Sequence, residues 1–577
     1  MKRMENQSSD NVLISEKGIV NYSVVYPEKA LTIAKLMDAI NALLKTLAES
    51  ADAPSVKSTM ATPSQYNATA LEILVGDTGY PETEAVKKEL AYGDWKICFY
   101  GHKLVVAAYS RYALIDAIEA LIELIQLNGN GEGTVSLALD TMLIGTHDAL
   151  INALPRCDDG TVSGTIYESR DCSLAVHSSM TADTYRAYLT KLEAEGYTYY
   201  TENSIGNNLY HIYQNHEYVI HTRYFGNLSE ARFNIEKKTT LVGLESENVY
   251  TPNPLVVTSL AQVGVTGSSD CYQLADGSFL VIDGGHTHDG PALYEYMKSK
   301  APNGKIVVAA WILTHGDGDH IGCICRFRNA YQDEVDLEMV IKNFPSDETG
   351  ADSGSREKSN VYDVAVNWQG KGCKLVKAHA GQKFYIRDAV VEVLLTIGDI
   401  APDPILKYND TSMVFTVDVA GERALFTADM SQQGAKMCVD AYGKYLKCDL
   451  MTIPHHGITN GYKFYMPNSV EFMTFARPEI VFWPHKSLQV HLGNPLRWIE
   501  LCSWNAEVMK SAREIYISGS GFPTVLELPY RPFSAYRYDP DETREPVRLE
   551  RASATDSLEY AVAVNAEDVD RVSWGKS

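Results

Sequence analysis

Six consecutive residues inside the stretch Thr314–Gly322 carry two imidazoles and two carboxylates, with glycines between them. Glycine lets the backbone take the tight dihedrals that turn neighbouring side chains towards one point. In an extended loop, residues two apart point the same way, so His315 and Asp317 could bind one metal ion. The adjacent pair Asp319 and His320, turned by the loop, could bind a second. The stretch therefore predicts a metal site.

Buried strands must hold these side chains in place. Residues 306–313, directly before the stretch, form an uninterrupted apolar run that is typical of a strand buried on both faces. Three further apolar runs also end in polar residues: residues 278–282 before Asp283, 423–428 before Asp429, and 450–453 before Pro454, His455 and His456. Strands of one sheet bring such ends together at one rim, so we expect the four polar clusters to share a cavity.

The composition limits the class of protein. A chain of 577 residues is too long for one core and predicts two to four domains. Its content of 45% hydrophobic and 22% charged residues is ordinary for a soluble globular protein. We find no secretory segment and no run long enough to span a bilayer, and the cysteines are mostly scattered. We therefore expect a cytoplasmic protein without membrane contact, and the oligomeric state stays open.

The net charge of −23 bears on the substrate. Binding of a long polyanion is driven by neutralised phosphates and released counterions, which requires a basic surface. The sequence has no dense cluster of lysine and arginine. It therefore favours a small-molecule substrate over a long nucleic acid.

The first part of the chain, residues 1–140, predicts a small α/β domain. A strand at 71–76 ends in glycine and leads through turn residues into a helix at 84–90. A hairpin is expected at 95–108, followed by a helix at 113–125 with apolar residues at helical spacing.

Two further domains and an arm are expected after it. Residues 155–245 predict a small α+β domain in which Thr181 is the N-cap of a helix. The two prolines of Thr251–Pro254 stiffen the chain and mark a linker. The third domain spans 255–530, and a polar C-terminal arm follows at 531–577.

The motif that opens at His315 resembles the His-x-His-x-Asp-His signature of the metallo-β-lactamase superfamily, with Asp317 in place of the second His. This His-x-Asp-x-Asp-His-x-Gly variant is most similar to the ComEC-type hydrolase domain of bacterial DNA-uptake proteins. The resemblance covers roughly Val256–Leu528. It implies an α/β fold with the superfamily's αββα sandwich in the C-terminal half, preceded by two small domains. The N-terminal region is loosely similar to the small, non-catalytic α/β domain that precedes glycoside hydrolase barrels, which implies a scaffold or docking module.

The resemblance also implies roles for single residues. In the superfamily the residue matched by Asp283 usually stays outside the metal shell and holds ligands by hydrogen bonds. A carboxylate can bridge two cations, and the family's bridging aspartate matches Asp429. The implied metal ligands are His315, Asp317, Asp319, His320, Asp429 and His455. The implied catalytic residues are Asp319, His456 and Asp283.

Two points stay open within this set. One of His455 and His456 should ligate and the other donate a proton or bind substrate, and we slightly prefer His455 as the ligand. Many superfamily members carry a metal-binding His near Asn409, where this sequence has none. Either Asn409 or Asp410 takes its place, or one metal has fewer protein ligands.

These features predict a metal-dependent hydrolase acting on a phosphodiester or another small ester. Two divalent cations about 3.5–4 Å apart would share a water and lower its pKa towards ~7. Zinc is the favoured metal, with manganese or iron as alternatives because Asp317 makes the site harder. One alternative function is a ComEC-like nuclease for single-stranded DNA, which would need a basic, aromatic-lined groove. Another is a non-catalytic, metal-containing binding or assembly protein.

Overall fold

The computed structural model describes residues 11–157, 161–169, 171–238, 255–259, 267–345, 371–401, 408–457, 470–484, 512–518, 523–537, 545–546, 549–551 and 561–563. The chain divides into two compact units, Met1–Tyr197 with Ala231–Lys237, and Thr198–Glu230 with Lys238–Ser577. The linker expected at Thr251–Pro254 lies outside the described residues. In the part of the chain listed above, no helix is long and apolar enough to cross a membrane.

The first unit contains an α/β domain whose main sheet has the strand order β4–β3–β5–β7–β6–β9. These strands are β3 Ser23–Tyr26, β4 Ser58–Met60, β5 Glu72–Val75, β6 Asp94–Tyr100, β7 Lys103–Ala108 and β9 Met142–Thr146. Strands β2 (Ile19–Val20), β1 (Asn11–Glu16) and β8 (Val135–Ala138) form a second, small sheet. The strand, hairpin and helix predicted between residues 71 and 125 are confirmed.

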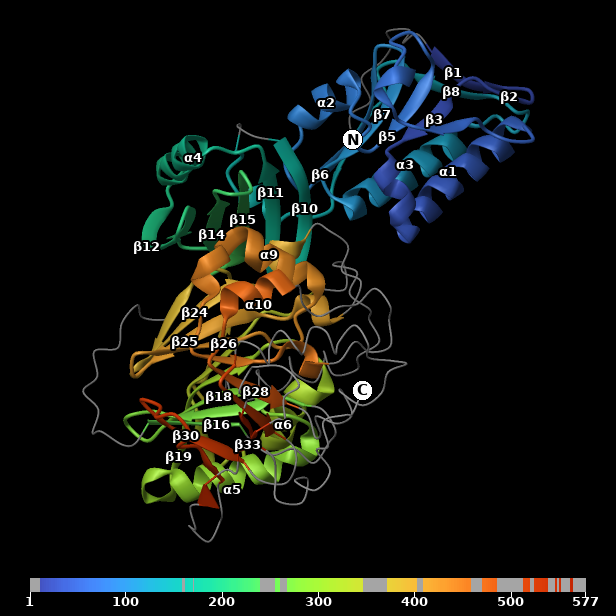
Figure 1. Cartoon of the computed structure of the whole chain (residues 1–577). Helices are drawn as coiled ribbons and strands as arrows, with labels where there is room; N and C mark the ends of the chain where they lie inside the picture. The colour runs from blue at the N-terminus through green and yellow to red at the C-terminus, as the bar shows by residue number, and fades with distance from the viewer. Residues whose placement is uncertain are drawn as a thin grey trace. The chain divides into compact units, whose positions relative to one another are not determined.

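Helices cover both faces of the main sheet in this unit (Figure 1). Helices α1 (Ala34–Ala51) and α3 (Arg111–Asn128) pack on one face through a shared apolar cluster. Helix α2 (Pro81–Lys88) packs on the other face through Val86 and Leu74. It begins three residues earlier than predicted because Pro81 occupies its first turn, where the missing N–H needs no partner.

The remaining part of the first unit is built around aromatic packing. Strand β10 (Thr161–Ser169) pairs antiparallel with β11 (Cys172–Ser178). Helix α4 (Ala182–Ala194) begins after the predicted N-cap Thr181, whose hydroxyl accepts a hydrogen bond from the Thr184 N–H at 3.1 Å. Tyr188 on α4 packs against Phe233 of β15 (Glu230–Lys237), with ring centroids 4.3 Å apart.

The second unit contains two large sheets. Within the described residues the first has the order β22–β21–β19–β18–β17–β16–β30–β31–β32, with β20 paired to β19, and the second has the order β23–β24–β25–β26–β27–β28–β29–β34–β33. The first sheet comprises β16 Leu255–Ser259, β17 Ser269–Gln273, β18 Phe279–Asp283, β19 Ile306–Leu313, β20 Val335–Leu337, β21 Met339–Lys342, β22 Lys374–Lys377, β30 Thr524–Leu528, β31 Tyr536–Arg537 and β32 Glu545–Pro546. The second comprises β23 Lys383–Ile386, β24 Ala389–Leu395, β25 Val414–Val419, β26 Glu422–Phe426, β27 Leu450–Thr452, β28 Ile480–Pro484, β29 Glu514–Ser518, β33 Leu549–Arg551 and β34 Ala561–Ala563. The predicted C-terminal arm therefore adds strands to both sheets.

The two sheets face each other across an apolar core to which Ile282, Phe415 and Phe482 contribute. Figure 1 shows helices α5 (Gly290–Lys300) and α6 (Gly318–Ala330) at the outer side of the first sheet, and α9 (Gln432–Tyr442) and α10 (Val470–Ala476) at the outer side of the second. Each outer face has its own apolar cluster beneath the helices. This order of layers confirms the predicted αββα sandwich, preceded by N-terminal α/β structure.

Three antiparallel strands of the second unit pack against the helical layer that covers the outer side of the second sheet. They are β12 Thr198–Ile205, β13 Asn208–Gln214 and β14 Tyr218–Phe225. These strands lie within the domain predicted at 155–245, and in the structure they belong to the second unit. Asn208 Nδ2 donates to the Ala441 carbonyl at 2.7 Å, and Arg223 Nε lies 2.9 Å from Asp399 Oδ1.

Replacing Arg223 by alanine is expected to lower the free energy of unfolding by about 3–5 kcal/mol, because it leaves the buried Asp399 carboxylate without its cation. Both side chains are almost fully buried, at 1% and 0% exposure. Denaturant unfolding measures the loss. The exposed pair Arg186–Asp183 supplies the control, since Arg186→Ala should cause no measurable change. Equal effects of the two variants would contradict the expectation.

Candidate metal centre

The predicted site residues lie at the carboxyl ends of neighbouring strands. In the first sheet β18 ends at Asp283 and β19 leads to His315. In the second, β26 leads to Asp429 and β27 to His455 and His456. Both strand pairs are parallel, so each sheet presents its polar ends at one edge.

Asp319 and His320 lie in the first turn of α6, where the sequence analysis expected a loop. Asp317 is the N-cap residue, and its carbonyl accepts hydrogen bonds from the N–H groups of His320 and Ile321, both at 3.0 Å. Aspartate is favoured at this position and in the first turn, which explains why the helix starts here. The turn buries His320 completely and leaves Asp319 partly exposed.

Asp429 lies at the centre of the cluster. Its Oδ1 is 3.1 Å from His320 Nε2 and 3.4 Å from His456 Nε2. Its Oδ2 is 3.7 Å from both His315 Nε2 and His455 Nε2. Each carboxylate oxygen therefore faces its own pair of imidazoles, as a carboxylate shared by two cations requires.

The imidazoles of His320 and His456 are held in one tautomer. His320 Nδ1 lies 2.7 Å from Asp283 Oδ2, and His456 Nδ1 lies 2.9 Å from the Pro484 carbonyl. Both oxygens only accept hydrogen bonds, so both Nδ1 atoms carry the proton. The two Nε2 atoms then turn lone pairs towards each other across 3.3 Å.

This arrangement fits a divalent cation. Besides the two lone pairs, Asp429 Oδ1 and Asp319 Oδ2 reach the same point, the latter 3.3 Å from His456 Nε2. His315, His320 and Asp429 form one group whose ligand atoms lie within 4.8 Å of one another, and Asp319, His320 and His456 form a second. Imidazole nitrogen with carboxylate oxygen is the donor set of zinc, manganese and iron sites.

The electrostatics of the cluster favour positive charge beside Asp429. Burial lowers the pKa of His456, but the charges of Asp429 and Asp319 outweigh it and raise that pKa to about 9. Burial lowers the pKa of His455 to about 4, against the opposing charge of Asp429. Burial raises the pKa of Asp429, and the neighbouring imidazoles bring it well below its usual range.

The remaining predicted residues lie around Asp429 Oδ2. Asp317 Oδ2 is 3.5 Å from His315 Nε2. Asn409, in the turn η7 (Tyr408–Thr411), donates from Nδ2 to Asp429 Oδ2 at 3.4 Å. Asn409 therefore contacts the cluster at the place where a histidine is missing from the motif, and Asp410 is buried beside it.

Thr314 and Trp483 contact the cluster but were not among the predicted site residues. Thr314 donates to Asp283 from its N–H at 2.9 Å and from its hydroxyl at 2.8 Å. Trp483 Nε1 donates to the His456 carbonyl at 2.9 Å. A hydroxyl-bearing residue between a predicted strand and a motif histidine was a weak sequence signal for the role of Thr314. The role of Trp483 depends on the pairing of β27 with β28, which the sequence does not show.

Four non-glycine residues at these strand ends have left-handed backbone conformations. Their φ values are 57° for Asp283, 47° for Ala428, 48° for His455 and 52° for His456. Each such residue costs about 1–3 kcal/mol and persists only where the surrounding structure over-determines it. The sharp turns end the strands and direct the side chains into the cluster.

A Gly457→Ala substitution should lower the free energy of unfolding by about 2–4 kcal/mol. Gly457 has φ +70°, and an added Cβ would lie 2.7 Å from Trp483 Cζ2. That ring is fully buried and cannot move away. Urea denaturation measures the loss. Gly421→Ala is the matched control, because its φ is +84° but nothing lies within 4 Å of the added Cβ. A loss no larger than that of the control would show that the contact with Trp483 is unimportant.

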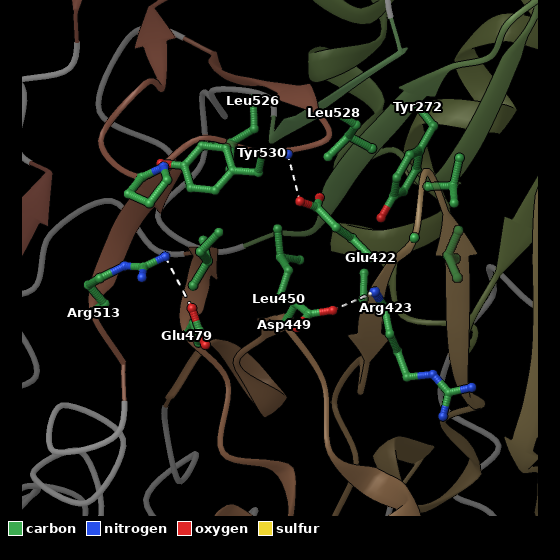
Figure 2. A pocket seen from close by; sticks show the side chains of 16 residues that line it. Tyr272, Glu422, Arg423, Asp449, Leu450, Glu479, Arg513, Leu526, Leu528 and Tyr530 are labelled. Atoms are coloured by element: carbon green, nitrogen blue, oxygen red, sulfur yellow. Dashed lines mark hydrogen bonds and ion pairs between the residues drawn. The ribbon is translucent and has the colours of Figure 1, made fainter.

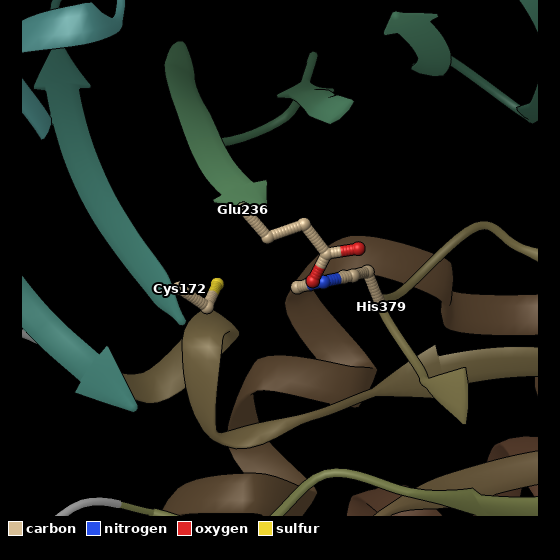
Figure 3. A group of neighbouring side chains, drawn as sticks. All are labelled: Cys172, Glu236 and His379. Carbon is tan, nitrogen blue, oxygen red and sulfur yellow. The ribbon is translucent and has the colours of Figure 1, made fainter. Parts of the chain in front are cut away.

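Figure 3 draws three other residues of metal-binding type. Cys172 begins β11 and accepts a hydrogen bond from Asn234 Nδ2 at 3.4 Å, and Glu236 lies near the end of β15, both in the first unit. His379, which follows β22, belongs to the second unit and packs against His221 with ring centroids 4.1 Å apart. We assign these residues no role.

Comparisons with known proteins gave one family match and several similar solved structures. Residues 264–482 match the family model of the Metallo-beta-lactamase superfamily. Among solved structures, the metallo-beta-lactamase fold protein YhfI from Bacillus subtilis is 18% identical, and the match covers 47% of this chain and 99% of that chain with a TM-score of 0.29. CmlA, a diiron beta-hydroxylase from Streptomyces venezuelae, is 13% identical, and the match covers 48% of this chain and 55% of that chain with a TM-score of 0.30. Unliganded yeast PDE1 is 12% identical, and the match covers 48% of this chain and 100% of that chain with a TM-score of 0.32. No curated protein matches the sequence.

The ComEC-type branch and the N-terminal resemblance to domains of glycoside hydrolases remain predictions. The family match spans the strands that carry Asp283, His315 and Asp429, and the layers of the second unit agree with it. Residues 264–482, in the C-terminal half of this chain, therefore match the metallo-β-lactamase superfamily.

Proposed function

We propose that the second unit is a metal-dependent hydrolase that cleaves a phosphodiester or another small ester. One observation supports this most directly: the lone pairs of His320 and His456 converge with oxygens of Asp429 and Asp319 at one buried point. Such a point favours positive charge, and members of the superfamily typically bind divalent metals.

Within this proposal, Asp319, His320, His456 and Asp429 hold one cation. His315, Asp317 and Asp429 hold the other, with His455 and Asn409 beside them. His456 replaces His455 as our preferred ligand, because its Nε2 faces both Asp429 and Asp319 and its ring is fixed by the Pro484 carbonyl. Divalent metals bound there supply Lewis acidity towards the ester and lower the pKa of water.

The chain's own residues position these ligands and determine where a substrate can approach. Asp283 accepts hydrogen bonds from His320 Nδ1 and Thr314, which fixes the ring. The four imidazoles are almost completely buried, whereas the side chains of Asp317 and Asp319 are 32% and 20% exposed. A substrate would therefore approach from the start of α6, over the two partly exposed carboxylates.

The proposal is tested with the purified full chain loaded with Zn²⁺ or Mn²⁺. Bis(p-nitrophenyl) phosphate, p-nitrophenyl acetate and a single-stranded oligonucleotide are offered as substrates, and metal content is measured by elemental analysis. We expect turnover of the phosphodiester or the acetate and loss of turnover after treatment with a chelator. The net charge of −23 disfavours the oligonucleotide.

Two results would replace the proposal. Cleavage of the oligonucleotide alone would make the chain a nuclease of the ComEC-like kind. Stable metal binding without turnover of a broad ester panel would favour a non-catalytic binding or assembly protein. Protein that binds no metal at all would refute the metal centre itself.

A further inference from the structure

A cavity of about 340 Å³ lies in the second unit, at the opposite strand ends from the metal centre. Its lining includes Glu422 at the start of β26, Leu450 at the start of β27 and Ile480 at the start of β28. The candidate metal ligands follow the other ends of β26 and β27. Figure 2 shows the side chains that line this cavity.

One side of the cavity is the open end of the core between the two sheets. Tyr272 and Leu526 come from the first sheet, and Val417, Leu450 and Ile480 come from the second. All five belong to the apolar cluster that joins the sheets. An apolar ligand placed here would extend that core and be removed from water, which stabilises binding by roughly 25 cal/mol per Å² of apolar surface.

The other side of the cavity carries unbalanced negative charge. Glu422 Oε1 accepts a hydrogen bond from the Tyr530 N–H at 2.6 Å, and Asp449 Oδ2 accepts one from the Arg423 N–H at 2.8 Å. Among the residues that the structure describes, neither carboxylate has an ion-pair partner. Burial raises the pKa of Glu422, the hydrogen bond from the Tyr530 N–H lowers it, and the nearby charge of Asp449 raises it, so that the pKa lies above its usual value.

The arginines of the lining are already paired with other carboxylates. Arg513 lies 3.1 Å from Glu479, and Arg423 Nε lies 2.8 Å from Asp418. In Figure 2 the guanidinium of Arg423 points away from the other lining side chains. An anionic ligand would therefore meet Glu422 and Asp449 without an available cation, whereas a cationic ligand would meet two carboxylates.

We propose that this cavity binds a small molecule with an apolar, ring-sized body and one ammonium group. The apolar body lies against Leu450, Ile480 and Leu526, and the ammonium donates hydrogen bonds to Glu422 and Asp449. Tyr272 adds an aromatic ring to the same cavity, which also suits a cation. The volume is at the lower end of the range for small-molecule pockets, about 300–1,000 Å³, so one ring with a short side chain fits.

The test measures binding of three matched probes to the metal-loaded full chain by isothermal titration calorimetry. The probes are 2-phenylethylamine, the neutral 2-phenylethanol and the anionic 3-phenylpropionate. Because a charge-assisted hydrogen bond is lost with the alcohol, the amine should bind at least about tenfold more tightly. The anion should bind more weakly than the alcohol.

Variants locate the binding site. Glu422→Gln and Asp449→Asn keep an oxygen that can accept the backbone hydrogen bond but remove the charge, so each should reduce the preference for the amine by about tenfold. Glu295→Gln, at an exposed position on α5, makes the same change elsewhere and should leave the preference intact. Thermal unfolding of each variant without ligand verifies that the fold is retained.

Two outcomes would overturn the proposal. One is equal affinity for amine and alcohol, or no binding of the amine below about 10 mM. The other is an amine preference that survives in the Glu422→Gln, Asp449→Asn double variant but is lost in Asp319→Asn, which would locate the amine in the metal centre. Because the cavity and the metal centre lie at opposite strand ends, failure of the ester hydrolysis test would leave this test unaffected.

Discussion

Replacing Asp429 by alanine is expected to lower kcat/KM for any ester turned over at the metal centre by about a thousandfold, and to remove most of the bound metal. The Asp429 carboxylate faces four imidazoles, two on each oxygen, at 3.1–3.7 Å. Without it, positive charge at either cation position loses its nearest shared anion.

The expected thousandfold loss of kcat/KM follows from the role of the Asp429 carboxylate in holding the metal. Lewis acid catalysis by a bound metal stabilises the transition state by several kcal/mol, and each 1.36 kcal/mol corresponds to about tenfold in rate. The measurement combines steady-state kinetics on bis(p-nitrophenyl) phosphate with elemental analysis of the same preparation. Activity and metal content should fall together.

Asp333→Ala is the matched control for this substitution. Asp333 is also an aspartate of the second unit, but its side chain is 95% exposed and pairs only with Lys371 on the surface. Neither kinetics nor metal content should change in that variant. If Asp429→Ala retained both its metal and its activity, the cluster around Asp429 would not be the catalytic centre.

The second large effect is expected at Asp283, which touches no candidate cation position directly. Replacing Asp283 by asparagine should weaken metal binding by about 10- to 100-fold. Asp283 Oδ1 accepts from the Thr314 N–H, and Oδ2 accepts from His320 Nδ1 and the Thr314 hydroxyl. An asparagine oxygen that keeps the first bond turns its NH₂ group towards His320.

That reversal changes the tautomer of the ring. His320 Nδ1 would then have to accept a hydrogen bond, and the proton would move to Nε2. Nε2 is the atom that faces Asp429 and His456, so its lone pair would be lost to a metal. Competition with a chromophoric chelator measures the affinity without reference to any substrate.

Asp276→Asn is the corresponding control. Asp276 lies in the hairpin before β18, where it accepts hydrogen bonds from Ser278 and Arg387 away from the cluster. Its variant should bind metal as the wild type does. An unchanged metal affinity in Asp283→Asn would mean that the hydrogen bond to His320 does not determine the tautomer.

Local sequence patterns predicted most of the secondary structure because the spacing of apolar residues reflects which side chains of a segment are buried. The run at 306–313 is apolar at every position, and β19 spans those residues with both faces covered. Thr181 precedes a helical repeat and caps α4. Helix α2 begins earlier than predicted because Pro81 favours the first turn, and Asp319 and His320 lie in a helix where a loop was expected because Asp317 favours a helix start.

The site could be predicted as a set of residues but not as an arrangement. His315, Asp317, Asp319 and His320 are close in the chain, so their proximity needed no tertiary information. The choice between His455 and His456 depended on a backbone φ near +50° at both residues and on the carbonyl of Pro484, which comes from a different strand. No spacing in the sequence encodes that contact.

The sequence patterns by themselves predicted the buried strands, the positions where polar residues follow them, and the types of the candidate ligands, because these follow from residue chemistry and burial along the chain. The sandwich was implied by the resemblance to the metallo-β-lactamase superfamily. Only the tertiary structure decided that Asp429 faces four imidazoles, that β12–β14 pack with the second unit, and that an acidic, apolar-floored cavity opens at the opposite strand ends. The reason is physical: the sheet that leads to His315 and the sheet that leads to Asp429 meet by face-to-face packing of their apolar side chains, and the pattern along a single strand carries no record of that packing.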